Sequence, residues 1–341
     1  MFKALFKLLL LVSLLAAAAA AGLAWDSDRL LHRPLQLHEV QRITLERGAT
    51  LQSGIDQLRS VGAFSNPRQW RYLRFYARLQ HLDAQIKAGD YDIAPDTSSL
   101  DLLDLLVQGR AVMSELRIPE GWKFAEALEL VRSHSDLVQT LPDNLAPAQV
   151  MERIGLGGKG FEGRIFPDTY RFTRGMKDAD FLRHSAHLMQ KKLDAEWAAR
   201  EAGLAYASPE EALIMASIVE KETGAAVERP RIAGVFLHRL KIGMKLQTDP
   251  TVIYGMGTAY DGNIRKTDLE TDTPFNTYTR AGLPPTPICL PGQAAIHAAL
   301  HPLDDGSLYF VALGDGSGQH HFSKTLDEHN AAVAQFLSRR K

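Results

Sequence analysis

The sequence predicts an α+β protein with an N-terminal transmembrane helix, a small α+β domain and a larger, mainly helical domain that carries a small β-sheet. Three observations indicate this: an apolar run over residues 2–25, alternating strand and helix patterns over residues 40–118, and long helical periods with one late hairpin after residue 119. The 341 residues, 45% hydrophobic and 23% charged, have an ordinary globular composition and suffice for more than one domain.

The apolar run at the N-terminus is long enough to span a bilayer. Residues 8–25 carry no charge, and the Lys7 side chain extends the span by reaching the interface. Lys3 and Lys7 precede it, which predicts a cytoplasmic N-terminus and export of everything after Trp25. The small residues at 22–24 also resemble the cleavage site of a signal peptide. We favour an uncleaved anchor over residues 1–25, followed by a linker over residues 26–39.

Charge and cysteine content exclude several functions. The net charge is −1, and no basic cluster with interleaved aromatic residues occurs, so we expect no nucleic-acid partner. The single cysteine, Cys289, forms no internal disulfide, so the exported part must fold on its hydrophobic core. Cys289 lies in a proline-rich loop without a neighbouring histidine, and we do not expect it to be catalytic.

Residues 40–118 are predicted to form the small α+β domain. The expected elements are a strand over 41–46, a helix from about Ala49, an aromatic helix over 67–82, a strand over 87–93, a helix over 99–108 and a strand over 111–118. The aromatic helix contains Trp70, Tyr72, Phe75 and Tyr76. These rings suit sugar stacking, but packing of the helix on a sheet explains them more simply.

The second domain is predicted to span residues 119–341, after a boundary at Pro-Glu-Gly. Its glycine- and aromatic-rich loop, residues 155–172, lacks the Gly-Lys-Ser/Thr of a phosphate-binding loop. The remaining predicted elements are helices at about 181–197, 208–223 and 229–242, a proline-rich loop over 283–292, a hairpin over 307–325 and a C-terminal helix.

The helix over residues 208–223 carries the main catalytic candidate. Ser208 is a good N-cap, Glu211 completes a capping box, and Gly224 is expected to end the helix. This register places Glu222 on the apolar face with Ile218, and Glu220 on another face. Burial and the negative end of the helix dipole both raise the pKa of such a carboxyl group, as a general acid near neutral pH requires. A structural salt bridge is the alternative explanation.

Two polar clusters follow, Gln247-Thr248-Asp249 and Asn276-Thr277-Tyr278-Thr279. A helix cap and an ordinary turn would explain them. A bound sugar, however, needs amide, hydroxyl and aromatic groups around one acid, and these clusters supply them.

His297 and His301 have the i, i+4 spacing of two metal ligands on a helix. No glutamate lies between them as in the metalloprotease motif, and Pro302 ends the helix at once, so we predict no metal site and no cofactor. Ser217 is not in a Gly-x-Ser-x-Gly turn, which argues against a serine hydrolase.

At ASIVEKETG, residues 216–224, the chain resembles the YceG-like (MltG) family of endolytic murein transglycosylases. The resemblance continues through residues 87–93, 162–172, 237–257, 273–288 and 301–312, which is nearly the whole chain after the anchor. The block QTDPTVIYG is highly specific. In the family the catalytic glutamate is the one before threonine in the E-K-E-T run, which corresponds to Glu222.

The resemblance implies a LysM-like domain over residues 40–118 and a catalytic domain with lysozyme-like features over residues 119–341. It also implies internal cleavage of nascent peptidoglycan strands between N-acetylmuramic acid and N-acetylglucosamine, with a 1,6-anhydro end. Glu222 would act as the single acid and base, on the periplasmic side of the inner membrane. The implied partners are peptidoglycan polymerases of the penicillin-binding class. The predicted substrate-binding residues are Gln247, Thr248, Asp249, Asn276, Tyr278 and Glu220.

Two other functions remain open on the sequence. A muramidase would use the same acid with attacking water and would need a further carboxylate, such as Glu220 or Asp249. A non-catalytic scaffold would only grip a glycan strand. Whether the LysM-like domain binds glycan also stays open.

Overall fold

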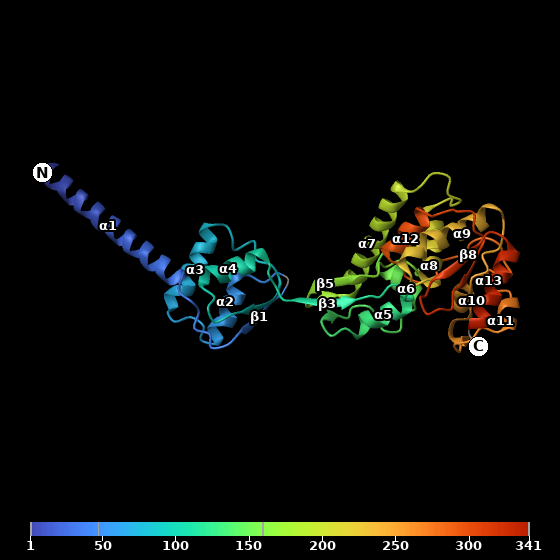
Figure 1. Cartoon of the computed structure of the whole chain (residues 1–341). Helices are drawn as coiled ribbons and strands as arrows, with labels where there is room; N and C mark the ends of the chain where they lie inside the picture. The colour runs from blue at the N-terminus through green and yellow to red at the C-terminus, as the bar shows by residue number, and fades with distance from the viewer. Residues whose placement is uncertain (1, 47, 159, 340–341) are drawn as a thin grey trace. The chain divides into compact units, whose positions relative to one another are not determined.

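The computed structural model describes residues 2–46, 48–158 and 160–339 (Figure 1). The chain forms two compact units, one of Met1–Ser114 with Arg171–Gly175 and the other of Glu115–Tyr170 with Met176–Lys341. Both combine helices and strands, which confirms the predicted mixed class. The first unit ends earlier than the predicted limit at residue 118, and it includes a short segment that we had assigned to the second domain. Lys159, in the predicted glycine-rich loop, lies outside the described residues.

Helix α1, Phe2–Leu31, is the single helix among the described residues that is long and apolar enough to cross a membrane. Its 30 residues extend about 45 Å, which exceeds the roughly 30 Å apolar layer of a bilayer. The helix does not end near Trp25, because Leu30 and Leu31 are buried in the first unit. Asp26 accepts bonds from Arg68 Nη1 at 2.9 Å and from the Tyr72 hydroxyl at 3.0 Å. The predicted linker over residues 26–39 therefore begins too early, because α1 continues to Leu31.

The first unit is built on one antiparallel strand pair with helices packed against it. Strand β1, Gln41–Leu45, pairs with β2, Gly89–Ile93, from Gln41 opposite Ile93 to Leu45 opposite Gly89. Besides α1, its helices are α2 (Leu51–Ser60), α3 (Pro67–Leu79) and α4 (Ser99–Gln108). Three of the four aromatic residues of α3 pack against the core, and Phe75 is exposed. Packing therefore explains most of the aromatic helix, as predicted.

Three short strand pairs contribute the remaining sheet structure. Strand β3 (Met113–Arg117) pairs with β5 (Thr169–Thr173), and β4 (Leu137–Val138) lies parallel to β6 (Met176–Lys177). Strands β7 (Tyr309–Ala312) and β8 (His320–Ser323) form the predicted antiparallel hairpin. The helices that accompany them in the second unit are α5 (Phe124–Ser133), α6 (Pro147–Arg153), α7 (Asp178–Ala199), α8 (Pro209–Glu222), α9 (Arg229–Lys241), α10 (Asp249–Met256), α11 (Lys266–Glu270), α12 (Gln293–Leu300) and α13 (Leu326–Arg339), with 3₁₀ turns at Ala226–Glu228 and Gly257–Ala259.

Helix α8 is the centre of the second unit. Its residues 212–219 are all buried, and the helix packs against α7, α9, α10 and α12 (Figure 1). The Ser208 hydroxyl accepts the N-terminal bond from Glu211 N, as predicted, whereas the Glu211 carboxylate accepts from Ala207 N, one residue earlier than a capping box. The helix ends at Glu222 because Thr223 adopts an extended conformation, before the predicted Gly224 is reached.

The proline-rich loop lies along α8 and is held by polar contacts. The Ser217 hydroxyl donates to Ile214 O at 2.7 Å and accepts from Ile288 N at 3.0 Å. The Cys289 thiol donates to Ser217 O at 3.3 Å. Burial raises the pKa of the Cys289 thiol well above its ordinary value, so this cysteine stays protonated and is part of the core.

We predict that Ser217→Ala destabilises the protein by about 1–3 kcal/mol, because the buried Ile288 N–H loses its acceptor. Ser133→Ala is the matched control, since the exposed Ser133 hydroxyl makes the same bond to the residue three before it, at 3.1 Å. Chemical unfolding of both variants measures the difference. Equal free energies of unfolding for the two variants would contradict the role given to Ser217.

Candidate active site

The predicted polar clusters meet at one cavity in the second unit. It has a volume of about 410 Å³ and contains Glu222 together with Gln247, Thr248, Asp249 and Tyr278. Both clusters therefore reach the candidate acid, although they lie more than twenty residues from it along the chain. The other lining residues are Phe236, Arg239, Tyr309, Phe310, Leu326 and His329.

Glu222 is the last residue of α8, and its surroundings disfavour the ionised form of its carboxyl group. Burial is the largest influence and raises the pKa of its carboxyl group from 4.5 to about 7. The negative charge of Asp249 adds to this increase, whereas the hydrogen bond from Thr248 and the charges of His320 and Arg239 oppose it. A carboxyl group with a pKa near 7 is suited to donate a proton and to take one back at neutral pH.

Thr248 holds the carboxylate in place. It precedes α10, and its hydroxyl donates to Glu222 Oε1, so it contacts the acid and does not cap the helix. Its own backbone N–H donates to Thr277 Oγ1 at 3.1 Å. Thr251 Oγ1 lies 2.8 Å from Thr248 O and 2.9 Å from Thr277 Oγ1. These three threonines are almost fully buried and join the two polar clusters into one rigid network.

Gln247 adopts a backbone conformation that is uncommon for a residue with a side chain. Its φ is 50°, in the left-handed region, and its N–H donates to Thr277 O at 3.2 Å. Such a conformation costs about 1–3 kcal/mol and is concentrated at functional sites. Gln247 adopts this strained conformation where it lines the cavity beside Glu222.

Tyr278 and Asp249 form a pair at the cavity wall. The Tyr278 hydroxyl donates to Asp249 Oδ1 at 2.5 Å. Burial raises the pKa of Tyr278 above its ordinary value of 10, and the bond to Asp249 raises it further. Tyr278 therefore remains protonated at physiological pH and donates to Asp249.

Asn276 does not line this cavity and has a different role from the direct sugar contact that we expected. It is 1% exposed, and its amide nitrogen donates to the backbone oxygens of Leu269 and Thr271 at 3.0 and 2.7 Å. Its side-chain oxygen accepts from Tyr278 N at 2.8 Å. Asn276 thus shapes the loop that presents Tyr278.

Glu220 also lies away from the cavity lining and forms the salt bridge that we had considered for Glu222. Its side chain is 6% exposed and lies 3.1 Å from Arg229 Nη2. It also accepts from Gly292 N at 2.9 Å. Burial raises the pKa of Glu220, while the bond from Gly292 and the charge of Arg229 lower it. This arrangement does not support a substrate-binding role for Glu220.

Sequence patterns did not reveal that Arg239 and His329 line the cavity. The Arg239 guanidinium is buried and donates to Leu308 O at 2.7 Å and Leu246 O at 2.5 Å. The His329 ring stacks on Tyr309 with centroids 5.2 Å apart, and burial lowers the pKa of His329. Both residues lie in amphipathic helices, where a single arginine or histidine carries no signal of its own.

The sequence model of the YceG-like family matches residues 43–335 of this chain. The chain belongs to the YceG-like family. A crystal structure of a putative yceG-like protein from Listeria monocytogenes is similar in fold, with a TM-score of 0.53 and 28% identity over 86% of this chain and 99% of the other.

Curated relatives of this YceG-like protein are named endolytic murein transglycosylase. The one from Bacillus subtilis strain 168 is 40% identical over 177 residues, which cover 52% of this chain and 48% of the relative. The one from Streptococcus pneumoniae strain D39 is 25% identical over 363 aligned positions, which cover 97% and 64% respectively. The chain thus spans between about half and two thirds of the length of these relatives.

We predict that Glu222→Gln stabilises the YceG-like protein at neutral pH. Because the folded-state pKa is raised, the natural protein loses stability as the pH rises from 4.5 to about 7, and the neutral amide escapes this loss. The gain above pH 7 is at most about 3 kcal/mol. Unfolding in denaturant across this pH range measures it, with Glu270→Gln at an exposed site as the control for losing one charge. A Glu222→Gln variant that is less stable at pH 8 than the natural protein would contradict the pKa assigned to Glu222.

Proposed function

We propose that this protein is a membrane-anchored endolytic murein transglycosylase, a lyase that cuts peptidoglycan strands internally between N-acetylmuramic acid and N-acetylglucosamine. The observation that carries the proposal is one carboxyl group, Glu222, with its pKa raised to about 7 in a cavity lined by amide, hydroxyl and aromatic groups. The names of the relatives from Bacillus subtilis and Streptococcus pneumoniae support the same reaction.

In the proposed reaction, protonated Glu222 gives its proton to the glycosidic oxygen as the bond to the anomeric carbon breaks. The resulting carboxylate then takes the proton from the 6-hydroxyl of the same muramic acid, whose oxygen closes on the anomeric carbon. The products are a 1,6-anhydro end and a free 4-hydroxyl, and no water is consumed. A pKa near 7 suits both steps, because the two forms of the acid differ little in free energy at neutral pH.

The neighbouring residues have distinct roles in this proposal. Thr248 fixes Oε1 of Glu222, which leaves Oε2 to carry the proton toward the substrate. Asp249 keeps the acid protonated through its negative charge, and Tyr278 holds Asp249 in place. Gln247 offers an amide to the sugar or to its N-acetyl group. That N-acetyl group would stabilise the positive charge at the anomeric carbon in place of a second carboxylate.

The N-terminal part would place this chemistry at a membrane surface. Helix α1 would anchor the chain in the inner membrane, with Lys3 and Lys7 in the cytoplasm and the cavity on the periplasmic side. The β1-α2-α3-β2 order with its antiparallel strand pair supports a LysM-like first domain, and the mainly helical second unit would be the lysozyme-like domain. An enzyme anchored in this membrane suits cleavage of nascent strands that penicillin-binding polymerases extend, and would terminate their elongation.

One observation favours a second function, hydrolysis by a muramidase. Asp249 lines the same cavity as Glu222 and could act as the further carboxylate. Its bond from Tyr278 at 2.5 Å already occupies one oxygen, which makes it less available as a nucleophile.

We predict that Glu222→Gln abolishes cleavage of uncrosslinked peptidoglycan strands, because the amide cannot donate the proton. Mass spectrometry of the digest should show internal fragments with anhydro-muramic ends from the natural protein and none from the variant. Glu210→Gln, the same exchange in the first turn of α8 and outside the cavity, should cleave normally. Reducing ends, heavier by one water, would establish a muramidase, and normal cleavage by Glu222→Gln would remove this acid from the mechanism.

We predict that Asp249→Asn and Thr248→Val displace the pH dependence of kcat/KM in opposite directions. Activity should fall as the pH rises through about 7, where Glu222 loses its proton. Removing the Asp249 charge lowers the pKa of Glu222 and moves this limb to lower pH, whereas removing the Thr248 hydrogen bond raises the pKa and moves the limb to higher pH. Each displacement should be up to about one pH unit. If both substitutions moved this limb in the same direction, the effects assigned to Asp249 and Thr248 on the pKa of Glu222 would be wrong.

A further inference from the structure

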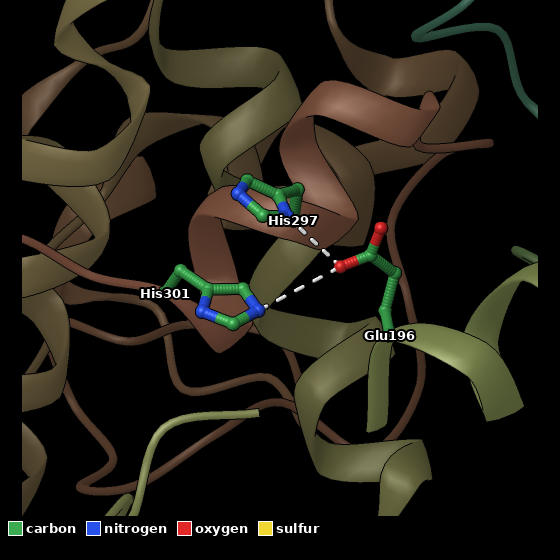
Figure 2. A group of neighbouring side chains, drawn as sticks. All are labelled: Glu196, His297 and His301. Carbon is green, nitrogen blue, oxygen red and sulfur yellow. Dashed lines mark hydrogen bonds and ion pairs between the residues drawn. The ribbon is translucent and has the colours of Figure 1, made fainter. Parts of the chain in front are cut away.

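A cluster of two histidines and one glutamate lies outside the cavity of Glu222. Glu196 on α7 faces His297 and His301 at the end of α12, and Figure 2 shows one carboxylate oxygen directed at both imidazoles. None of the three lines the active-site cavity. We propose that this cluster binds a divalent transition metal ion. Zinc is the ion that we consider and test.

The distances between the candidate ligand atoms suit a small ion. Glu196 Oε2 lies 2.9 Å from His297 Nδ1 and 3.8 Å from His301 Nε2, and the three ligand atoms all lie within 4.8 Å of one another. Zinc bonds of 2.0–2.2 Å in a tetrahedral site place ligand atoms about 3.3–3.6 Å apart. Side-chain movements of under about 1 Å would therefore bring the three atoms to zinc-binding distances.

One neighbouring residue already orients Glu196, and a second carboxylate lies near His301. Gln293 Nε2 donates to Glu196 Oε1 at 2.5 Å, which leaves Oε2 facing the imidazoles. Glu201 Oε1 lies 4.0 Å from His301 Nδ1, the ring nitrogen that does not face Glu196. This separation is too long for a hydrogen bond, and an approach of about 1 Å would let Glu201 select the tautomer of His301 and strengthen it as a ligand. Gln293, His297 and His301 follow one another at intervals of four residues, so α12 presents the set on one face.

The chemistry and exposure of the cluster indicate the kind of ion. Two imidazoles and one carboxylate suit zinc and similar transition metals, whereas magnesium and calcium prefer oxygen ligands alone. The side chains of Glu196 and His301 are 17% and 24% exposed, and that of His297 is 56% exposed. Solvent therefore reaches the cluster, and water would complete the tetrahedron.

The position of the cluster suggests what a bound ion would do. The ion would join α7 to α12, and α12 packs against α8, the helix that ends at Glu222. It would stabilise the scaffold behind the acid and take no part in the reaction. The sequence argued against a metal site because no glutamate lies between His297 and His301 and because Pro302 ends the helix. The candidate third ligand lies on a helix about a hundred residues earlier, where local spacing could not reveal it.

The test is zinc titration of the untagged full-length protein in detergent micelles, after removal of metal with EDTA. Isothermal titration should show one tight site, and zinc should raise the melting temperature, since an ion that binds only the folded state stabilises it. His297→Ala and Glu196→Gln should each lower zinc affinity by at least about 100-fold and remove the thermal shift. His187→Ala, at an exposed position of α7 outside the cluster, should bind zinc as the natural protein does.

Two further measurements separate a built site from zinc that adheres to surface histidines. X-ray absorption of the zinc-loaded protein should show nitrogen and oxygen ligands at about 2.0–2.1 Å, with the signature of two imidazoles. Gln293→Ala, which removes only the partner of Glu196, should weaken binding about 10- to 100-fold. Equal melting temperatures in EDTA would show that the variants are folded. Zinc affinity unchanged in His297→Ala and Glu196→Gln, or no binding by the natural protein, would overturn the proposal and leave a simple ion-pair cluster.

Discussion

The candidate active site depends on the burial of one carboxyl group, which lies at the end of a buried helix. Helix α8 is enclosed on nearly all sides, so its last residue, Glu222, emerges from the core directly into a cavity. The carboxyl group is partly desolvated, so its charged form is disfavoured and its pKa rises to about 7. Replacing Glu222 by a neutral residue would relieve the free-energy cost of burying this charge. The proposed reaction, however, needs a group that exchanges a proton at neutral pH.

Two glutamates only two residues apart show how environment assigns roles to the same side chain. Glu220 meets Arg229 and the N–H of Gly292, so it secures the loop that runs along α8. Glu222 meets a neutral hydroxyl from Thr248 and the like charge of Asp249. Burial raises the pKa of both carboxyl groups, but the charge of Arg229 favours the ionised form of Glu220, whereas the charge of Asp249 disfavours the ionised form of Glu222.

The shape of the cavity depends mainly on buried polar side chains that hold the backbone of the two polar segments in place. Asn276 and the buried threonines 248, 251 and 277 are nearly inaccessible, yet they set the conformation of both polar segments. The left-handed Gln247 shows that this network holds the chain in a conformation it would not otherwise adopt. The position of the Glu222 carboxyl group therefore depends on a buried hydrogen-bond network.

Local patterns determined much of this protein: the helices at 99–108 and 209–222, the β7–β8 hairpin and the apolar N-terminal helix all follow from periodicity, capping and turn residues. Periodicity also predicted that Glu222 and Glu220 lie on different faces of α8, and Glu222 alone of the two lines the cavity. The sequence alone could not show that α1 continues into the core, that Asn276 supports Tyr278 from behind, or that Arg239 and His329 reach the cavity. Nor could it bring Glu196 to His297 and His301. Those features are contacts between distant segments, and only the packing of whole elements decides which distant side chains meet.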